Sequence, residues 1–394
     1  MDINNLDELR REENEIVNKF KFTEKDFGKI LTNLLKIPTV TNINCWYDNI
    51  IVTDNKKGEE YRFDFSNATP EDIEEYRLAI RKMPENLAHN MGKPYTHAQP
   101  ILDAENTDNE DIGRLRINSI YSDVVTSDKT YQPAVSIRKT LMKLRINKDN
   151  ILSSNYASQK ILDLFEIILK ARCSMVISGK TNAGKTELLR YEARNLEGNI
   201  ITIEDTREAY LKYNYPEKNV LEIKADPEDF SKFIRACLRQ APDWILVSES
   251  RNEEVLDLLN SVSTGHSIVT TLHSSSAPQI PNRIVDMAKV SGSNVSRVTR
   301  QVYQNIDIGV HLDYQATKEG SKRKIEEICE YFVEYNNETG REINRCHTIC
   351  KYNYETKRYE YFPIQSPRIK EQLLKRNIST ENIKGVFIQW ANIT

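Results

Sequence analysis

The sequence predicts an α/β protein in which a mostly parallel sheet, with helices on both faces, follows a smaller α+β domain. Past about Asn150, short apolar runs rich in β-branched residues alternate with helical segments, a pattern typical of parallel strands buried on both faces. Before that point, short β-like runs alternate with helices in a more polar context. The length of 394 residues adds a prior of roughly two or three domains.

The amino-terminal part divides into two predicted segments. Residues 1–30 are expected to form a charged helical extension, either a helix solvated against its own domain or one that binds a partner. Residues 31–148 are expected to form the α+β domain and a linker, with loop across Pro84–Asp111, which is rich in Asn and Asp. Helices are expected at Lys29–Leu35 and Pro70–Lys82, and strands at Asn49–Thr53, Tyr61–Phe65, Ile117–Tyr121 and Ala134–Ile137.

Residues 149–394 are predicted to form the α/β domain with a carboxy-terminal subdomain. Because ligands of such sheets bind at the carboxyl ends of the strands, the candidate chemistry is expected there. Strands are expected at Ser174–Ser178, Asn199–Ile203, Trp244–Val247 and Ser267–Thr271, with helices at Lys185–Asn195, Pro227–Arg239 and Glu253–Val262. The tail is expected to hold a strand at Asp307–Leu312, a hairpin of Lys324–Tyr335 with Ile343–Tyr352, and a closing strand and helix.

Composition excludes several classes of protein. With 39% hydrophobic and 29% charged residues, the chain is neither a disordered nor a membrane protein. The amino terminus, MDINNLDELRREENEIVNKF, is charged throughout, so we expect no signal peptide and a cytosolic location. Six scattered cysteines do not suggest a disulfide framework. With 55 Lys and Arg against 58 Asp and Glu, no direct nucleic-acid partner is predicted, although a local basic groove remains possible.

A phosphate-binding motif lies between a predicted strand and a predicted helix. The run GKTNAGKT matches GxxxxGK(S/T) throughout, with the strand before it and the helix after it that this motif requires. Its glycines let successive N–H groups and the helix N-terminus face a β-phosphate. Lys185 would then reach the β- and γ-phosphates, and the Thr186 hydroxyl would coordinate Mg²⁺. The less favoured alternative is a strand-to-helix turn with an exposed lysine. The residues expected to bind ATP are Gly179, Lys180, Thr181, Asn182, Ala183, Gly184, Lys185, Thr186 and Glu187.

Acidic residues follow two later strands. Glu204 and Asp205 come after the strand 199–203, which we expect beside the phosphate motif, where one of these carboxylates could orient an attacking water. A helix cap or a surface salt bridge is an equal alternative for this segment. Glu249 follows the strand 244–247, as expected for a residue that holds Mg²⁺ or its water shell.

These residues belong to a wider pattern that resembles a known family. The runs Leu238–Asp243, Thr264–His266 and Thr270–His273, together with Glu249, Arg251 and Glu254, are similar to the secretion and pilus traffic ATPases of bacteria and archaea. The resemblance covers roughly residues 30–375 and implies a RecA-like P-loop NTPase domain. It places the Walker A motif on Gly179–Thr186, the Asp box on Ile203–Glu208, the Walker B region on Ile245–Glu249 and the His box on Thr264–His273.

The resemblance also implies roles for single residues. Glu204 would activate water, Glu249 would assist Mg²⁺, and Lys185 would bind the transferred phosphate. His266 and His273 would lie near the γ-phosphate or at a subunit boundary, although a lone histidine is more often structural. The arginines implied are Arg116 and Arg138, which would approach the nucleotide from the amino-terminal domain, and Arg207 and Arg239, further candidates for stabilising charge.

The chain departs from the family pattern at some positions. The family usually has glycine at Ser248, an aliphatic residue at Ser250, and glycine or aspartate at Asn252; none of these is a ligand, so we expect activity to survive. The paired CxxC motif of many type II secretion and pilus extension ATPases is absent, and Cys346 with Cys350 is a poor zinc motif. The branch stays open between type II secretion, type IV or Tad pili, and conjugation.

The resemblance implies a Mg-ATP-hydrolysing motor that assembles as a homo-hexamer. Such a motor powers protein or DNA secretion, or pilus assembly, through inner-membrane platform proteins, and these partners would hold it peripherally at the cytoplasmic face of the cell membrane. Two other classes of function stay open. One is a nucleic-acid-stimulated RecA-like motor, and the other is a non-hydrolysing nucleotide-binding scaffold, which the altered neighbours of Glu249 motivate.

Overall fold

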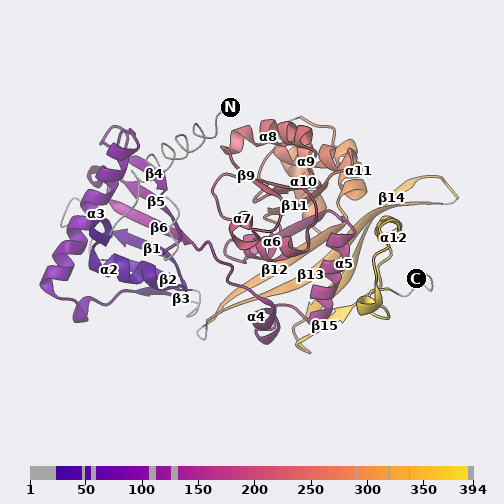
Figure 1. Cartoon of the computed structure of the whole chain (residues 1–394), viewed down its shortest axis with the longest axis horizontal. Helices are drawn as coiled ribbons and strands as arrows, with labels where there is room; N and C mark the ends of the chain where they lie inside the picture. Colours follow the sequence, from indigo (N-terminus) through magenta and orange to yellow (C-terminus); the bar gives the residue numbers. More distant parts are fainter. Residues whose placement is uncertain are drawn as a thin grey trace. The chain divides into compact units, whose positions relative to one another are not determined.

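The computed structural model describes residues 24–46, 49–54, 59–105, 112–125, 132–289, 292–317, 320–336 and 338–388 (Figure 1). The chain divides into two compact units, one of Met1–Met142 with Ala316–Ser321 and the other of Lys143–Gln315 with Lys322–Thr394. Most of the predicted extension, residues 1–23, lies outside the described residues. The domain limits 1–30, 31–148 and 149–394 stay predictions.

In its described residues, the first unit is an antiparallel sheet packed against helices. The sheet has the order β3-β2-β1-β6-β5-β4. Its strands alternate buried and outward residues, so that Leu115 and Ile117 join the core with Ile80 while Arg116 faces away from it. The elements are α2 (Glu24–Lys36), β1 (Val40–Trp46), β2 (Asn49–Asp54), β3 (Glu59–Arg62), α3 (Pro70–Asn90), β4 (Ile101–Glu105), β5 (Arg114–Ile120) and β6 (Ala134–Thr140).

The expected loop across Pro84–Asp111 is wrong for two stretches. Helix α3 continues through Pro84 to Asn90, and β4 occupies residues 101–105. A proline inside a helix costs about 3 kcal/mol because it removes a hydrogen bond and crowds the preceding turn. Here the apolar side of α3 runs across the proline, with the buried side chain of Met83 before it and that of Leu87 after it, and their burial in the core offsets that cost.

A smaller correction concerns the expected strand at Tyr61–Phe65. The strand β3 ends at Arg62, and residues 65–67 form a 3₁₀ turn. Asp64 explains the change, because its carboxylate accepts hydrogen bonds from the N–H and the hydroxyl of Ser66, at 2.9 Å and 2.8 Å. A local side-chain cap of this kind competes with strand pairing.

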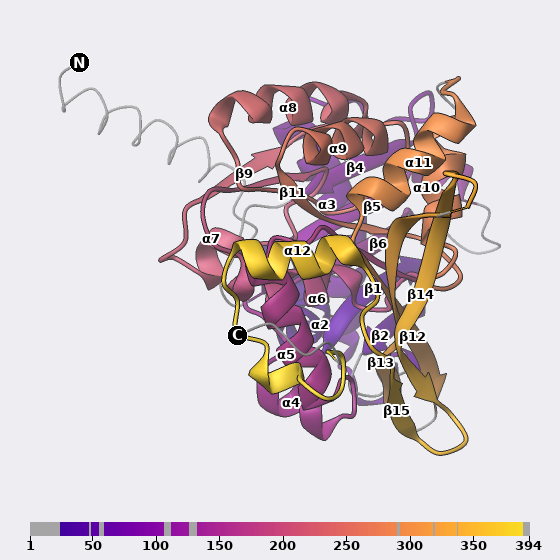
Figure 2. The ribbon, with the colours of Figure 1, turned by 90° about the vertical axis from the view of Figure 1, so that its right-hand side faces the viewer.

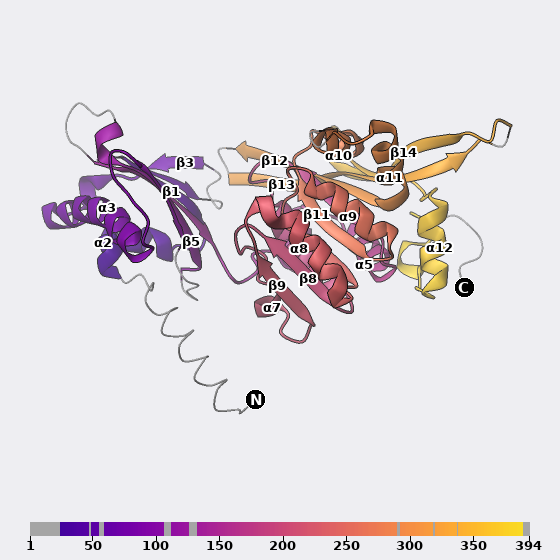
Figure 3. The ribbon, with the colours of Figure 1, turned by 90° about the horizontal axis from the view of Figure 1, so that it is seen from above.

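In the described residues, the second unit contains a nine-stranded sheet with the order β15-β14-β13-β12-β7-β11-β10-β8-β9. Strands β12, β7, β11, β10, β8 and β9 pair in parallel, whereas β13, β14 and β15 extend the sheet as an antiparallel region. Figure 3 shows β8 and β9 on one side of β11, and β12, β13 and β14 on the other. Their bounds are β7 (Met175–Gly179), β8 (Ile200–Glu204), β9 (Val220–Lys224), β10 (Trp244–Val247), β11 (Ser267–Leu272), β12 (Ile308–Thr317), β13 (Gly320–Tyr335), β14 (Glu342–Asn353) and β15 (Arg358–Tyr361).

Helices cover both faces of this sheet, and each face has its own core. Along β7, Met175 and Ile177 pack in the core that contains Phe165 of α5, while Val176 packs in the core that contains Leu258 of α9. Figure 2 shows α8, α9, α10 and α11 gathered apart from α4, α5 and α12. The helices are α4 (Lys148–Ser153), α5 (Gln159–Lys170), α6 (Lys185–Glu192), α7 (Leu211–Asn214), α8 (Phe230–Cys237), α9 (Glu254–Ser263), α10 (Ile280–Lys289), α11 (Val295–Asn305) and α12 (Pro367–Lys375). The predicted fold class is confirmed.

Gly309 on β12 gives a test of how β12 packs. A Cβ at this position would lie 1.9 Å from the hydroxyl oxygen of Tyr331, which is buried and donates a hydrogen bond to the carbonyl of Ala277. We therefore expect Gly309→Ala to lower the free energy of unfolding by about 1 to 3 kcal/mol, measured by urea denaturation. In the background of Tyr331→Leu, which removes the hydroxyl and the ring, Gly309→Ala should lower the free energy of unfolding by much less than it does in the wild type. Additive effects of the two substitutions would contradict this packing.

Candidate functional site

The phosphate motif forms a loop between β7 and α6. Asn182 and Gly184 adopt the left-handed region, with φ of 63° and 91°, and a Cβ at Gly179 would lie 2.8 Å from the carbonyl oxygen of Leu312. No side chain caps the N-terminus of α6, an eight-residue helix. Its first N–H groups therefore lack intrahelical partners and can bind an anion.

The side chain of Lys185 is folded into this loop. Its buried ammonium group donates to the carbonyl oxygens of Gly179, at 3.1 Å, and Lys180, at 3.2 Å, and lies 3.5 Å from Nδ1 of His273. A buried charge needs such partners, because burial without them is strongly unfavourable. Phosphate oxygens can replace the loop carbonyls when an anion binds.

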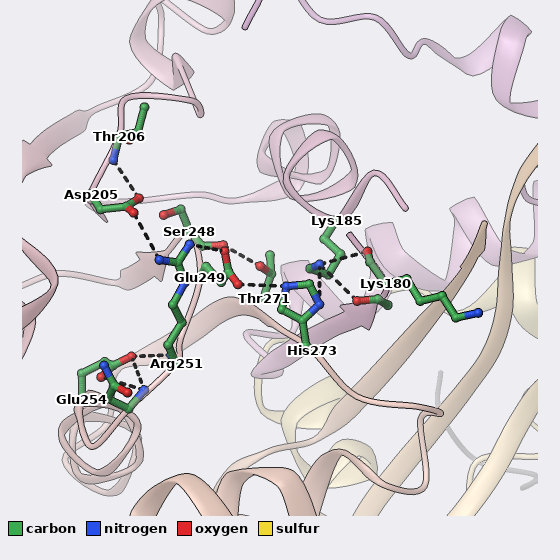
Figure 4. Close-up of polar contacts among 12 residues, drawn as sticks. Lys180, Lys185, Asp205, Thr206, Ser248, Glu249, Arg251, Glu254, Thr271 and His273 are labelled. Atoms are coloured by element: carbon green, nitrogen blue, oxygen red, sulfur yellow. Dashed lines mark hydrogen bonds and ion pairs between the residues drawn. The ribbon is translucent and has the colours of Figure 1, made fainter. Parts of the chain in front are cut away.

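From Lys185, a chain of polar contacts crosses the carboxyl edge of the sheet (Figure 4). Nε2 of His273 lies 3.0 Å from one oxygen of Glu249, and the other oxygen accepts a hydrogen bond of 2.7 Å from Arg251. Arg251 in turn lies 3.6 Å from a carboxylate oxygen of Asp205. The structure thus brings together Lys185, His273 and Glu249, as the sequence predicted, and adds Arg251 and Asp205.

Arg251 and Asp205 were not assigned roles in the site. The available signal for Arg251 was its place beside Glu249 in the pattern that resembles the family. The available signal for Asp205 was its position directly after β8, at the same edge of the sheet. Neither signal is specific, because charged residues after strands are common.

Two links hold the segment that carries Glu249. The carboxylate of Glu254 accepts hydrogen bonds from the N–H groups of Arg251, at 2.6 Å, and Asn252, at 3.0 Å, so it fixes the turn into α9. The neighbouring strand β11 supplies the other link. The hydroxyl of Thr271 donates to the carbonyl of Ser248 at 2.6 Å, and the hydroxyls of Ser250 and Thr270 are 2.8 Å apart.

The charges around Glu249 keep it ionised. Burial alone would raise the pKa of this carboxyl group. The hydrogen bond from Arg251 and the nearby charges of His273 and Lys185 outweigh burial and lower the pKa below its ordinary value. Glu249 is therefore an acceptor for protein donors or for water around a metal ion.

The expected place of Glu204 beside the phosphate loop is wrong. Strands β10 and β11 lie between β8 and β7, so β8 is three strand spacings, or ~14 Å, from the strand that ends in the loop. The carboxylate of Glu204 is buried and accepts hydrogen bonds from the N–H groups of Glu208, at 3.2 Å, and Ala209, at 2.9 Å. Burial raises its pKa to about 8.

Other predicted nucleotide contacts have partners within the second unit. Glu187 accepts a hydrogen bond from the N–H of Arg145 and lies 3.0 Å from Arg190, so its carboxylate is used away from the loop. Thr186 is half-buried in the first turn of α6, and Lys180 and Thr181 are exposed. The structure adds Arg323 of β13, whose Nε donates to the carbonyl of Asn182 at 2.8 Å and so supports the left-handed turn of the loop.

His266 and Arg239 lie at the opposite edge of the sheet. His266 precedes β11, and its Nδ1 is 2.7 Å from the carbonyl of Pro242, whereas His273 follows the same strand. A strand of six residues separates them, which is ~20 Å. Arg239 is exposed in a 3₁₀ turn before β10. The structure does not bring either residue to the phosphate loop of its own chain, and a role at a subunit boundary stays a prediction.

The remaining predicted arginines lie on strands or strand ends. Arg207 is 2.6 Å from a carboxylate oxygen of Glu222 on β9. Arg116 on β5 and Arg138 on β6 lie directly opposite each other in the sheet of the first unit. Their approach to a nucleotide stays a prediction.

The residues at the phosphate loop are suited to Mg²⁺ that is bound together with a nucleotide and keeps part of its water shell. In the part of the chain that the structure describes, no three His, Cys, Asp or Glu side chains gather as a metal site. Mg²⁺ bound with a nucleotide keeps several waters and needs only one or two protein ligands. The Thr186 hydroxyl at the open helix end and the ionised Glu249 meet that requirement.

Comparison with known proteins places the chain in a family. The family model described as Type II/IV secretion system protein matches residues 107–332, more than half of the sequence. The chain belongs to this family. Its members include secretion and pilus ATPases, which supports a motor role and the use of a nucleotide. None of the helices that the structure describes is both long and apolar enough to span a membrane.

Individual relatives cover different shares of the chain. An uncharacterised protein of Bacillus anthracis is 27% identical over 82% of this chain and 70% of its own length. The conjugal transfer protein TrbB of Rhizobium radiobacter is 26% identical over 62% of this chain and 71% of its own length. The Type II secretion system protein E of Pseudomonas aeruginosa is 33% identical, over 34% of this chain and 27% of its own length.

Solved structures of related ATPases share the fold. The pilus retraction motor PilT with bound ADP gives a TM-score of 0.52 at 18% identity and covers 83% of both chains. The ATPase DotB of Yersinia pseudotuberculosis gives a TM-score of 0.56 at 14% identity, with 79% of this chain and 80% of that chain covered. The RecA-like domain with a preceding amino-terminal domain is therefore confirmed.

The buried Glu204 predicts a dependence of stability on pH. Its pKa is about 8 in the folded chain against an ordinary value of 4.5, so unfolding between these values releases a proton. Stability that is present below pH 4.5 is therefore lost as the pH rises to about 8, by at most ~1.4 kcal/mol per pH unit. We expect Glu204→Gln to flatten this part of the profile in urea titrations at several pH values. Parallel profiles for the two proteins would contradict the burial of this group.

Proposed function

We propose that this chain is a Mg-ATP-hydrolysing motor that works as a homo-hexamer and powers secretion or pilus assembly through a membrane-embedded machine. The observation that carries the proposal is the polar chain from Lys185 through His273 to Glu249, which starts inside a phosphate-binding loop. Membership of a family that contains secretion and pilus ATPases supports the same role. The machine itself is proposed only in this general form, since the relatives' names include conjugal transfer, type II secretion and pilus retraction.

The residues of the loop bind and orient the nucleotide. The N–H groups of the first turn of α6 hold the phosphates, and Lys185 leaves the carbonyls of Gly179 and Lys180 to bind phosphate oxygens. Mg²⁺, held by Thr186 and through its water shell by Glu249, would neutralise charge on the bound phosphates. His273 lies between Lys185 and Glu249 and holds these two side chains at a fixed spacing along the edge of the sheet.

Water activation is assigned to Glu204 as part of the proposal. A pKa near 8 suits a general base that works close to neutral pH. Glu204 is the last residue of β8, three strands from β7, so to act its carboxylate has to leave the N–H groups of Glu208 and Ala209, and the water that it activates has to lie over this edge of the sheet. The charge that develops on the phosphate would be stabilised by arginine, and the candidates are Arg116, Arg138, Arg207, Arg239 and, from the structure, Arg251.

The proposed partners follow from the same role. We propose that inner-membrane platform proteins bind the hexamer and hold it peripherally at the cytoplasmic face of the membrane. No direct contact with nucleic acid is proposed, because the chain has no basic excess, with 55 Lys and Arg against 58 Asp and Glu.

Replacing the lysine of the loop tests ATP hydrolysis. We expect Lys185→Ala to abolish ATP turnover in a phosphate-release assay, because the phosphates lose their buried cation. Lys170→Ala, which removes an exposed lysine paired with Glu166 on α5, is the matched control and should turn over ATP like the wild type. Undiminished hydrolysis in Lys185→Ala would refute the proposal. Turnover that rises steeply with added DNA and falls with salt would instead indicate a nucleic-acid motor.

Replacing the proposed base tests the assignment of Glu204. We expect Glu204→Gln to bind ATP with wild-type affinity and to hydrolyse it about 10² to 10³ times more slowly, the effect expected for loss of a general base. The comparison is Glu249→Gln, whose amide cannot replace the negative charge beside His273. A wild-type rate in Glu204→Gln, together with a slow Glu249→Gln, would move the role of base to Glu249.

A further inference from the structure

A hollow of about 440 Å³ lies beside the phosphate loop, within the second unit. Its walls come from the end of β7 with the start of the phosphate loop, from the segment after β11, and from helix α10. The lining residues are Gly179, Lys180, His273, Ser274, Ser275, Gln279, Asn282, Arg283 and Asp286. The volume is roughly fifteen times the ~30 Å³ that a water molecule occupies in the liquid, so a small hydrated anion has room there.

The lining consists mainly of hydrogen-bond donors. In the residues that the structure describes, Arg283 is exposed and has no ion pair, and the only acid of the lining, Asp286, is 2.7 Å from Lys289. The side-chain NH₂ of Asn282 donates a hydrogen bond to the side-chain oxygen of Gln279 at 3.0 Å. The NH₂ group of Gln279 takes no part in this hydrogen bond. A guanidinium group with amides and serine hydroxyls around it is suited to a phosphate-like oxyanion.

The hollow adjoins the polar chain of the candidate site through a shared residue. His273 belongs to both places, because it contacts Lys185 and Glu249 and also lines the hollow. After cleavage, ADP would stay on the loop N–H groups, so inorganic phosphate has to leave in the direction away from the β-phosphate. The lining of the hollow joins Gly179, Lys180 and His273 to residues of α10, so a phosphate released beside His273 would have this hollow next to it.

We propose that this hollow is a second anion site, which receives the inorganic phosphate released by hydrolysis, and that Arg283 is the residue that holds it. The inference rests on the proposed function, since hydrolysis supplies the phosphate. It assigns to α10 a part in product release that is separate from cleavage. The ligand is a free tetrahedral oxyanion, which enters the hollow without a covalent step.

The test is binding of radiolabelled inorganic phosphate by equilibrium dialysis. The full chain is first loaded with ADP, Mg²⁺ and beryllium fluoride, which occupies the position of the terminal phosphate beside Lys185. We expect the wild type to bind further phosphate. Arg283→Gln should bind phosphate with an affinity at least about tenfold lower, which is the effect expected for the loss of one charge-assisted hydrogen bond. Arg283→Lys keeps the charge and should retain more of the affinity than Arg283→Gln.

Arg297→Gln is the matched control, because Arg297 is an exposed arginine on α11 outside the hollow. We expect it to bind phosphate like the wild type. In turnover assays, more added phosphate should be needed to inhibit Arg283→Gln than to inhibit the control.

Two results would overturn the inference. One is a wild type that binds no phosphate once beryllium fluoride is in place, and the other is equal phosphate affinity in Arg283→Gln and the control. Failure of the proposed function is seen separately, as turnover that does not depend on Lys185. If turnover depends on Lys185 but phosphate binding does not depend on Arg283, the inference about the hollow is wrong and the proposed function stands.

Discussion

The candidate site depends on a positive charge held inside the phosphate loop. Lys185 is buried, and an ammonium group in that position is tolerated only because backbone carbonyls accept its hydrogen bonds. Those carbonyls converge because the loop turns through left-handed backbone at Asn182 and Gly184. The carbonyls and the turn together keep a cation at the mouth of an uncapped helix, where the helix dipole also favours an anion.

The strands that flank β7 support this loop from opposite sides. On one side, β12 brings the carbonyl of Leu312 so close to Gly179 that no larger residue fits, and β13 brings Arg323 to the carbonyl of Asn182. On the other side, β11 leads directly into His273, the first residue of the polar chain beyond the loop. The loop is therefore held by strands that come from distant parts of the sequence, and its conformation depends on the whole sheet.

Features of the fold and of the site were predictable from the sequence where neighbouring residues alone determine them. The loop was predictable because GKTNAGKT carries within eight residues the glycines, the lysine and the threonine that the chemistry needs. The distance of Glu204 from the loop was not, because the order of strands in a sheet depends on packing between segments far apart in the chain. The continuation of α3 through Pro84 was missed for a similar reason. The local signal of a proline was outweighed by the burial of Met83 and Leu87 in a core that forms only in the folded unit.

One position at which the chain departs from the family pattern has an explanation in the same sheet. Ser250 lies where the resemblance implies an aliphatic residue, and its hydroxyl is 2.8 Å from that of Thr270 on β11, next to the hydrogen bond that the backbone carbonyl of Ser248 accepts from Thr271. Hydrogen bonds are directional, so they fix the position of the segment 248–250 along β11 more strictly than an apolar contact would. Because β11 leads directly into His273, the same bonds set the distance between His273 and Glu249. Ser250 therefore helps to preserve the spacing of the polar chain although it does not belong to it.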